Sequence, residues 1–140
     1  MKKVLLVVSI VALALVAYGD DGGRPFSTTL TGAAEVPGPG DPDGSGEAVL
    51  QLNPGLQQVC FQLTADDIAP AAASHIHVGA EDVAGPVVIG LTPPTSGSSS
   101  GCVSADRDLI LDIIQNPENY YVNVHNADFP GGAIRGQLSR

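Results

Sequence analysis

The sequence predicts an all-β fold, a β-sandwich or barrel with one short helix. The chain beyond its N-terminal segment is rich in Gly, Pro, Ser and Thr, and its apolar residues come in short runs between turn signals. Two of these runs, 47–53 and 56–64, alternate apolar and polar side chains with a period of two. This alternation is typical of strands that bury one face.

The first half of the chain contains three predicted strands. RPFSTTLTG (24–32) is the first, and the turn-dense segment 33–46 with its three prolines is a loop. EAVLQLN (47–53) is the second strand and LQQVCFQLT (56–64) is the third, with an Asn-Pro-Gly reversal at 53–55 between them. In the third strand, we expect the apolar set to face the core and the glutamines to face away.

The middle of the chain is predicted as two further strands between connections. Residues 65–73 (ADDIAPAAA) are interpreted as a connection, SHIHVG (74–79) as a strand, and GPVVIGL (85–91) as another. The segment TPPTSGSSSG (92–101) is interpreted as a polar loop, because it has no apolar alternation.

One segment, DRDLILDIIQNP, departs from the strand pattern. Its apolar residues recur at helical spacing, Asp106 stands at the N-cap position, and Asn116-Pro117 ends the pattern. We therefore expect a short helix that packs against the sheet. YYVNVHN (120–126) and AIRGQL (133–138) are then two strands joined by a hairpin-length loop.

The first nineteen residues have the pattern of a secretory signal peptide. A basic MKK precedes an apolar run shorter than the roughly 20 residues of a membrane-spanning helix. We predict cleavage after residue 19, one domain over 20–140, and a secreted or periplasmic protein with no stable membrane anchor. An uncleaved N-terminal anchor is the alternative interpretation.

The charge of the chain argues against nucleic-acid partners. The formal net charge is −9, and loss of the two lysines with residues 1–19 would make it −11. A surface this acidic repels nucleic acid and anionic lipid, and attracts cations. Solubility of a secreted protein is the preferred interpretation of most of these acidic residues.

The two cysteines, Cys60 and Cys102, predict one disulfide. An even pair in an oxidising compartment is most simply a single bridge. The alternative is a blue-copper site, in which one of these thiolates joins two histidines, and that site would require a free thiol.

The three histidines, His75, His77 and His125, are predicted to lie on strand faces that point away from the core. His75 and His77 are two residues apart on one strand, so their side chains share a face. On the later strands, Val122 and Val124 mark the core side. The opposite side therefore carries the polar set of Tyr121, Asn123, His125 and Arg135.

Two functions follow from this arrangement. Three imidazoles, two of them at i and i+2, form a common nitrogen site for a copper or zinc ion, so we predict metal ligands at His75, His77 and His125. The alternative is a structural or protein-interaction module, in which the histidines join Tyr121, Asn123 and Arg135 in a hydrogen-bonded polar cluster. The acids of the following loops are interpreted as solvated.

The sequence does not predict an enzyme. It contains no G-x-S-x-G motif and no carboxylate pair at a defined site, and the predicted disulfide leaves no cysteine nucleophile. The expected partners are a metal ion or an extracellular protein.

Several motifs in a fixed order resemble a known family. EVP near the start, HIHVG followed by GPVV, and the closing YVNVH and PGGAIRGQL stand in the order found in the CHRD domain. This domain was named for its occurrence in chordin and is widespread in secreted bacterial proteins. The resemblance covers essentially the whole chain after the signal segment.

The resemblance implies a Greek-key β-sandwich of immunoglobulin or superoxide-dismutase-like character, located outside the cytoplasm. The family's three recurrent histidines correspond to His75, His77 and His125, and its recurrent arginine to Arg135. Metal binding has been proposed for this histidine motif, and chordin itself binds growth factors. The catalytic set of superoxide dismutase does not carry over, because that enzyme needs more than the three histidines present here.

Overall fold

The structure, a computed structural model, describes residues 23–140, so the predicted signal peptide 1–19 lies outside the described residues. The described chain forms eight strands, one α-helix and two short 3₁₀ helices. In chain order, these elements are β1 (Arg24–Thr31), η1 (Gly32–Ala34), β2 (Ser45–Asn53), β3 (Gln58–Asp66), β4 (Ala71–Val78), β5 (Val87–Leu91), β6 (Ser98–Ser104), α1 (Arg107–Gln115), η2 (Pro117–Asn119), β7 (Tyr120–Asn126) and β8 (Ile134–Gln137).

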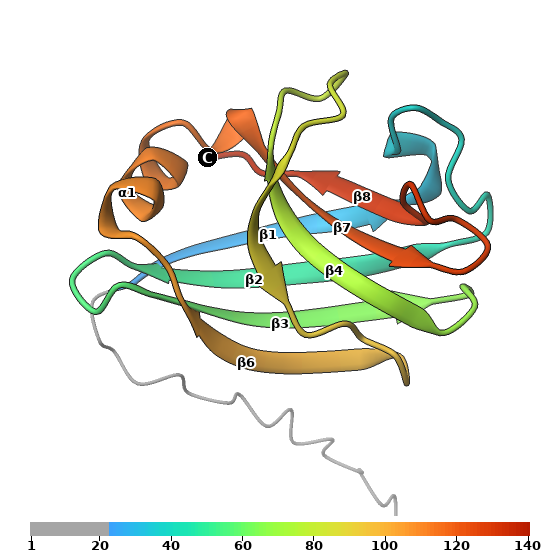
Figure 1. Ribbon diagram of the computed structural model, residues 1–140, viewed down its shortest axis with the longest axis horizontal. Coiled ribbons are helices and arrows are strands. Elements are labelled where there is room, and N and C mark those ends of the chain that lie inside the picture. The colour runs from blue at the N-terminus through green and yellow to red at the C-terminus, as the bar shows by residue number, and fades with distance from the viewer. Residues whose placement is uncertain (1–22) are drawn as a thin grey trace, which may run out of the picture.

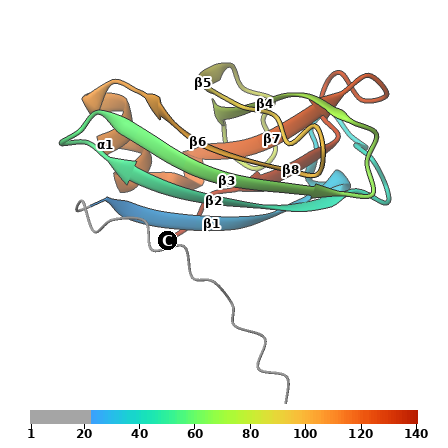
Figure 2. The same cartoon turned by 90° about the horizontal axis from the view of Figure 1, so that it is seen from below.

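All eight strands belong to one antiparallel sheet with the order β5-β4-β7-β8-β1-β2-β3-β6. The sheet curves over on itself, so that β4, β5 and β7 lie across β1, β2 and β3 with the core between them (Figures 1 and 2). The prediction of an all-β fold with one short helix is confirmed. The Greek-key connectivity stays a prediction.

Alternating residues of the strands form the core. Leu50 of β2 lies opposite Phe61 of β3, and both are buried. Their neighbours two residues away on either side are buried as well, so the predicted core faces of these strands are correct. Each large apolar side chain moved out of water contributes about 1.5–3 kcal/mol, which makes this layer the main source of stability.

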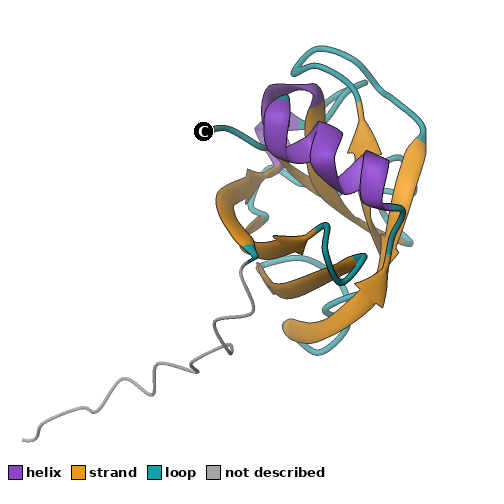
Figure 3. Ribbon diagram, turned by 90° about the vertical axis from the view of Figure 1, so that its left-hand side faces the viewer, coloured by secondary structure: helices purple, strands orange, loops and turns teal. Residues whose placement is uncertain are grey.

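Helix α1 lies at one end of the molecule (Figures 1 and 3). It begins after the N-cap residue Asp106, ends before Asn116, and buries Ile110 and Ile113 against the core. The predicted helix is therefore confirmed, although the Asp106 side chain makes no capping hydrogen bond. No helix among residues 23–140 is long and apolar enough to cross a membrane.

The prediction of a polar loop over 92–101 is wrong from residue 98 onward, because Ser98–Ser104 forms strand β6. This strand pairs with β3 along its whole length, yet most of its side chains are exposed. An edge strand that buries little carries no apolar alternation, so the pattern used for prediction is missing. Similarly, Ala71–Ala73 was predicted as part of a connection but begins β4.

Candidate metal centre

The register of β4 and β7 brings the three histidines to one area of the sheet. Ala73 of β4 lies opposite His125 of β7, and His75 lies opposite Asn123. Directly opposed residues of antiparallel strands share a face. Together with the alternation along β4, this places His75, His77 and His125 on the side of the sheet that points away from the apolar core, as predicted.

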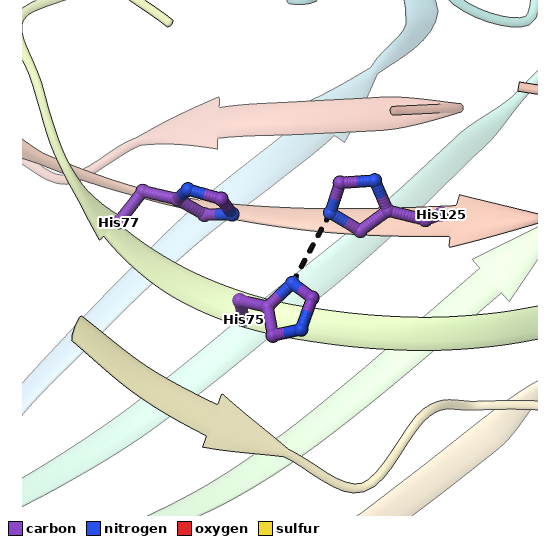
Figure 4. A group of neighbouring side chains, drawn as sticks. All are labelled: His75, His77 and His125. Carbon is purple, nitrogen blue, oxygen red and sulfur yellow. Dashed lines mark hydrogen bonds between the residues drawn. The ribbon is translucent and has the colours of Figure 1, made fainter. Parts of the chain in front are cut away.

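The three imidazole rings converge (Figure 4). One ring nitrogen from each histidine lies within 4.8 Å of those from the other two. His75 Nδ1 is 3.2 Å from His125 Nε2, and the ring centroids of His75 and His77 are 5.4 Å apart. The group can therefore hold one metal ion.

Backbone carbonyls fix the tautomers of two of these rings. His77 Nδ1–H donates to the carbonyl oxygen of Gly85 at 2.8 Å, and His125 Nδ1–H donates to that of Pro130 at 3.0 Å. Because a carbonyl only accepts, each Nδ1 carries the proton and each Nε2 carries a free lone pair. Histidines that bind metals are oriented in this way by a hydrogen bond to the other ring nitrogen.

The two lone pairs have different environments. His125 Nε2 accepts a hydrogen bond from His75 Nδ1–H. His77 Nε2 is buried and has no hydrogen-bond partner among the described residues. An unpaired buried nitrogen of this kind costs stability unless something binds it.

The electrostatics of the site favour neutral imidazoles. Burial lowers the pKa of His75 below 6.5, and the neighbouring His125 and His77 lower it further. Burial also lowers the pKa of His125, partly opposed by the hydrogen bond to Pro130. Neutral rings are the form that binds a metal ion, so the protein does not need to lose protons from these two ligands at pH 7.

The distances between the ring nitrogens can be compared with those around a single bound metal ion. Metal–nitrogen bonds are about 2.0–2.1 Å long, so two nitrogens on one tetrahedral ion lie roughly 3.3 Å apart. The 3.2 Å between His75 Nδ1 and His125 Nε2 matches this spacing, and His75 would offer Nδ1 to an ion by moving its proton from Nδ1 to Nε2. The 4.8 Å limit of the group exceeds it by about 1.5 Å, so the rings would have to move closer together around an ion.

A second layer of residues supports His77. The Tyr121 ring stacks on the His77 ring, with centroids 4.7 Å apart and an interplanar angle of 5°. The Arg135 guanidinium carbon lies 3.4 Å from the centroid of the same tyrosine. The Tyr121 hydroxyl accepts a hydrogen bond from Gly85 N–H at 3.0 Å, so the tyrosine also holds the residue that orients His77.

Arg135 fixes the loop between β4 and β5, residues 79–86. Its guanidinium donates to the carbonyl oxygens of Val83 and Ala80 at 2.9 and 2.8 Å, and its side chain is only 1% exposed. Because this loop lies over the outer face, Arg135 and Tyr121 are buried although they point away from the apolar core, and Asn123 on the same face is buried beside Glu35. The predicted face was correct, but the sequence did not show that loops cover it.

Glu35 belongs to the same buried layer and was not among the predicted site residues. Burial raises its pKa to about 7, although Arg135, the Asn123 amide and the Val36 N–H all favour the ionised form. Oε1 of Glu35 and Oδ1 of Asn123 are both buried without a described partner. The sequence signal that could have identified Glu35 was the Glu-Val-Pro motif. This motif is part of the family resemblance, but it shows no hydrophobic periodicity.

The carboxyl group of Glu35 requires a glycine at position 132. A Cβ on Gly132 would stand 2.2 Å from Glu35 Oε2, and the backbone there has φ +135°. Only glycine combines this conformation with this approach. The Pro-Gly-Gly turn between β7 and β8 is therefore shaped partly by the buried carboxyl group.

Neither the two cysteines nor the acids of the neighbouring loops join the histidine group. Cys60 and Cys102 are opposed on β3 and β6 and form a disulfide, so no cysteine is free for a blue-copper site. Glu81, Asp82 and Asp128 are exposed, and within residues 23–140 no carboxylate joins the histidine group.

Comparison with known families agrees with this structure. The CHRD domain family profile matches residues 26–138, which is most of the chain. The chain therefore belongs to the CHRD domain family. Neither the curated proteins nor the solved structures contained a significant match.

Proposed function

We propose that this CHRD domain is a metal-binding module that holds one copper or zinc ion through His75, His77 and His125. The observation that carries the proposal is the buried Nε2 of His77, which has no partner while its Nδ1 is anchored to Gly85. A metal ion at the centre of the three rings would satisfy this lone pair and replace the hydrogen bond between His75 and His125.

The ligand set favours Cu(II) on intrinsic affinity. Three imidazole nitrogens suit both copper and zinc, and copper binds the same nitrogen donors more tightly. Metal availability decides which ion is held in the native compartment.

We also propose that the protein works in the periplasm or outside the cell. The disulfide supports this location, because such bonds persist in oxidising compartments and are rare in the cytosol. A signal peptide over 1–19 would deliver the chain there.

The test is a metal analysis of protein purified without a histidine tag and loaded with Cu(II) or Zn(II). We expect about one equivalent bound, and less than about 0.1 equivalent at micromolar protein would reject the proposal. His77→Ala should abolish the metal-induced rise in melting temperature, because the rise depends on binding to the folded state. Gln62→Ala, on β3 away from the histidines, is the matched control and should keep it.

The second candidate is a structural or protein-interaction module. The observation that favours it is the hydrogen-bonded clamp on loop 79–86, in which Arg135 is joined by Gln137, whose amide donates to Gly79 and Glu118 carbonyl oxygens at 2.8 Å. Under this function, His77→Ala would lower the melting temperature equally with and without added metal.

A further inference from the structure

The proposed metal centre would carry a net positive charge when an ion is bound. All three donors are neutral imidazoles, so a bound divalent ion keeps its whole charge. Within residues 23–140 no carboxylate or thiolate belongs to the group to offset it. Behind the site the Arg135 guanidinium, which stacks on Tyr121, adds a further positive charge, which Glu35, Glu81 and Asp82 partly offset. The centre would therefore attract an anion.

The exposure of the ligands shows from which side an anion can approach. His77 is only 7% exposed and is covered by loop 79–86, whereas His75 and His125 are partly exposed. The solvent side of the group is thus the side formed by His75 and His125.

Gly90 keeps the flank of His75 open. Gly90 lies opposite His75 in the pairing of β5 with β4, so a side chain there would stand on the histidine face. A Cβ at Gly90 would meet no atom within 4 Å, and the residue is exposed. Space for a ligand therefore adjoins the exposed half of the site.

We propose that the metal-loaded centre binds one small inorganic anion at an exchangeable position on its solvent side, beside His75 and Gly90. This inference rests on the proposed metal-binding function. A metal with three protein ligands retains a fourth position for water or another ligand. The anion takes this position and a water molecule leaves, with no change in oxidation state.

The experiment uses the full protein loaded with Cu(II), after metal analysis has established the bound equivalents. Azide is the probe, at about 0.15 M salt, where the acidic surface is screened beyond roughly 8 Å. We expect a saturable change in the copper electron paramagnetic resonance spectrum and a new charge-transfer absorption, both fitting one azide per copper. The metal-free protein should show neither.

Gly90→Leu tests the position of the anion. A leucine there fills the space beside His75 without entering the ligand set, so the bound copper should be unchanged while azide binding weakens by about tenfold or more. Ser100→Leu, which adds the same side chain to the exposed strand β6, is the matched control and should bind azide like the wild type.

The outcomes separate the two proposals. Absence of bound copper overturns the exchangeable position, and absence of bound zinc as well overturns the proposed metal-binding function too. Bound copper with spectra that azide does not alter overturns only the exchangeable position. Equal azide binding by the wild type and Gly90→Leu, with copper retained, overturns the assignment of the anion to the side beside Gly90.

Discussion

Replacing Glu35 by Gln should change how stability depends on pH. Glu35 is 4% exposed, and burial raises its pKa from 4.5 to about 7. The folded state therefore holds a proton on this carboxyl group over a pH range in which the unfolded chain has lost it. The stability that this proton contributes is fully present below pH 4.5 and is lost as the pH rises through 7.

The size of the effect follows from the difference between the two pKa values. Going from 4.5 to about 7 corresponds to about 3 kcal/mol of unfolding free energy. Gln has nearly the same shape and never ionises, so the variant avoids this loss. The unfolding free energy of Glu35→Gln, minus that of the wild type, should rise by about 3 kcal/mol between pH 4.5 and pH 8.

The assay is urea denaturation of both proteins, without metal, at several pH values across this range. His75 and His125 have lowered pKa values, so they make the folded state less stable as the pH falls below 6.5. Both proteins share these histidines, and the difference between the two curves removes their contribution. A difference that stays constant with pH would refute the reasoning, because it would mean that Glu35 has the same pKa in the folded and unfolded states.

Two further predictions concern Arg135 and the disulfide. Arg135→Met should lower the unfolding free energy by at least about 3 kcal/mol, because it leaves the carbonyls of loop 79–86 and the buried Glu35 without their partner. The exposed Arg24→Met is the control in the same denaturation assay and should cost less than about 0.5 kcal/mol. Replacing Cys60 and Cys102 by Ser should cost about 4 kcal/mol for a sequence separation of 42, and a loss below about 1 kcal/mol in urea denaturation would contradict the loop-closure argument.

The spacing of apolar residues was sufficient to predict a strand or helix wherever the element places a regular set of apolar side chains in the core. Strand β7 has the predicted bounds, and α1 lies within its predicted segment, because their apolar residues recur at the spacing of the element. Strand β6 was missed for the opposite reason. It is held by pairing with β3 and by the disulfide, and neither interaction produces an apolar pattern along the strand itself.

The candidate site could be predicted only in part. Alternation placed the three histidines on one side of the sheet, because the face of a residue depends on its position within its own strand. The carbonyl groups of Gly85 and Pro130 could not be predicted, since they depend on how two loops fold back over that side. Glu35 is a similar case, because it is surrounded by residues distant in the sequence, such as Gly132 and Arg135, and no pattern around position 35 indicates its burial.

The cover over the outer face has a consequence for how freely the sequence can vary. In β7 six of the seven residues are buried and the seventh, His125, is partly buried, so both sides of this strand are interior. In β6 nearly every side chain reaches solvent, and many replacements there would leave the packing intact. Two strands of the same sheet should therefore differ strongly in how well they tolerate substitutions. Apart from Cys102 of the disulfide and Val103, which packs against the core, β6 should accept most substitutions, while almost any change in β7 would disturb either the apolar core or the polar layer that holds the histidines.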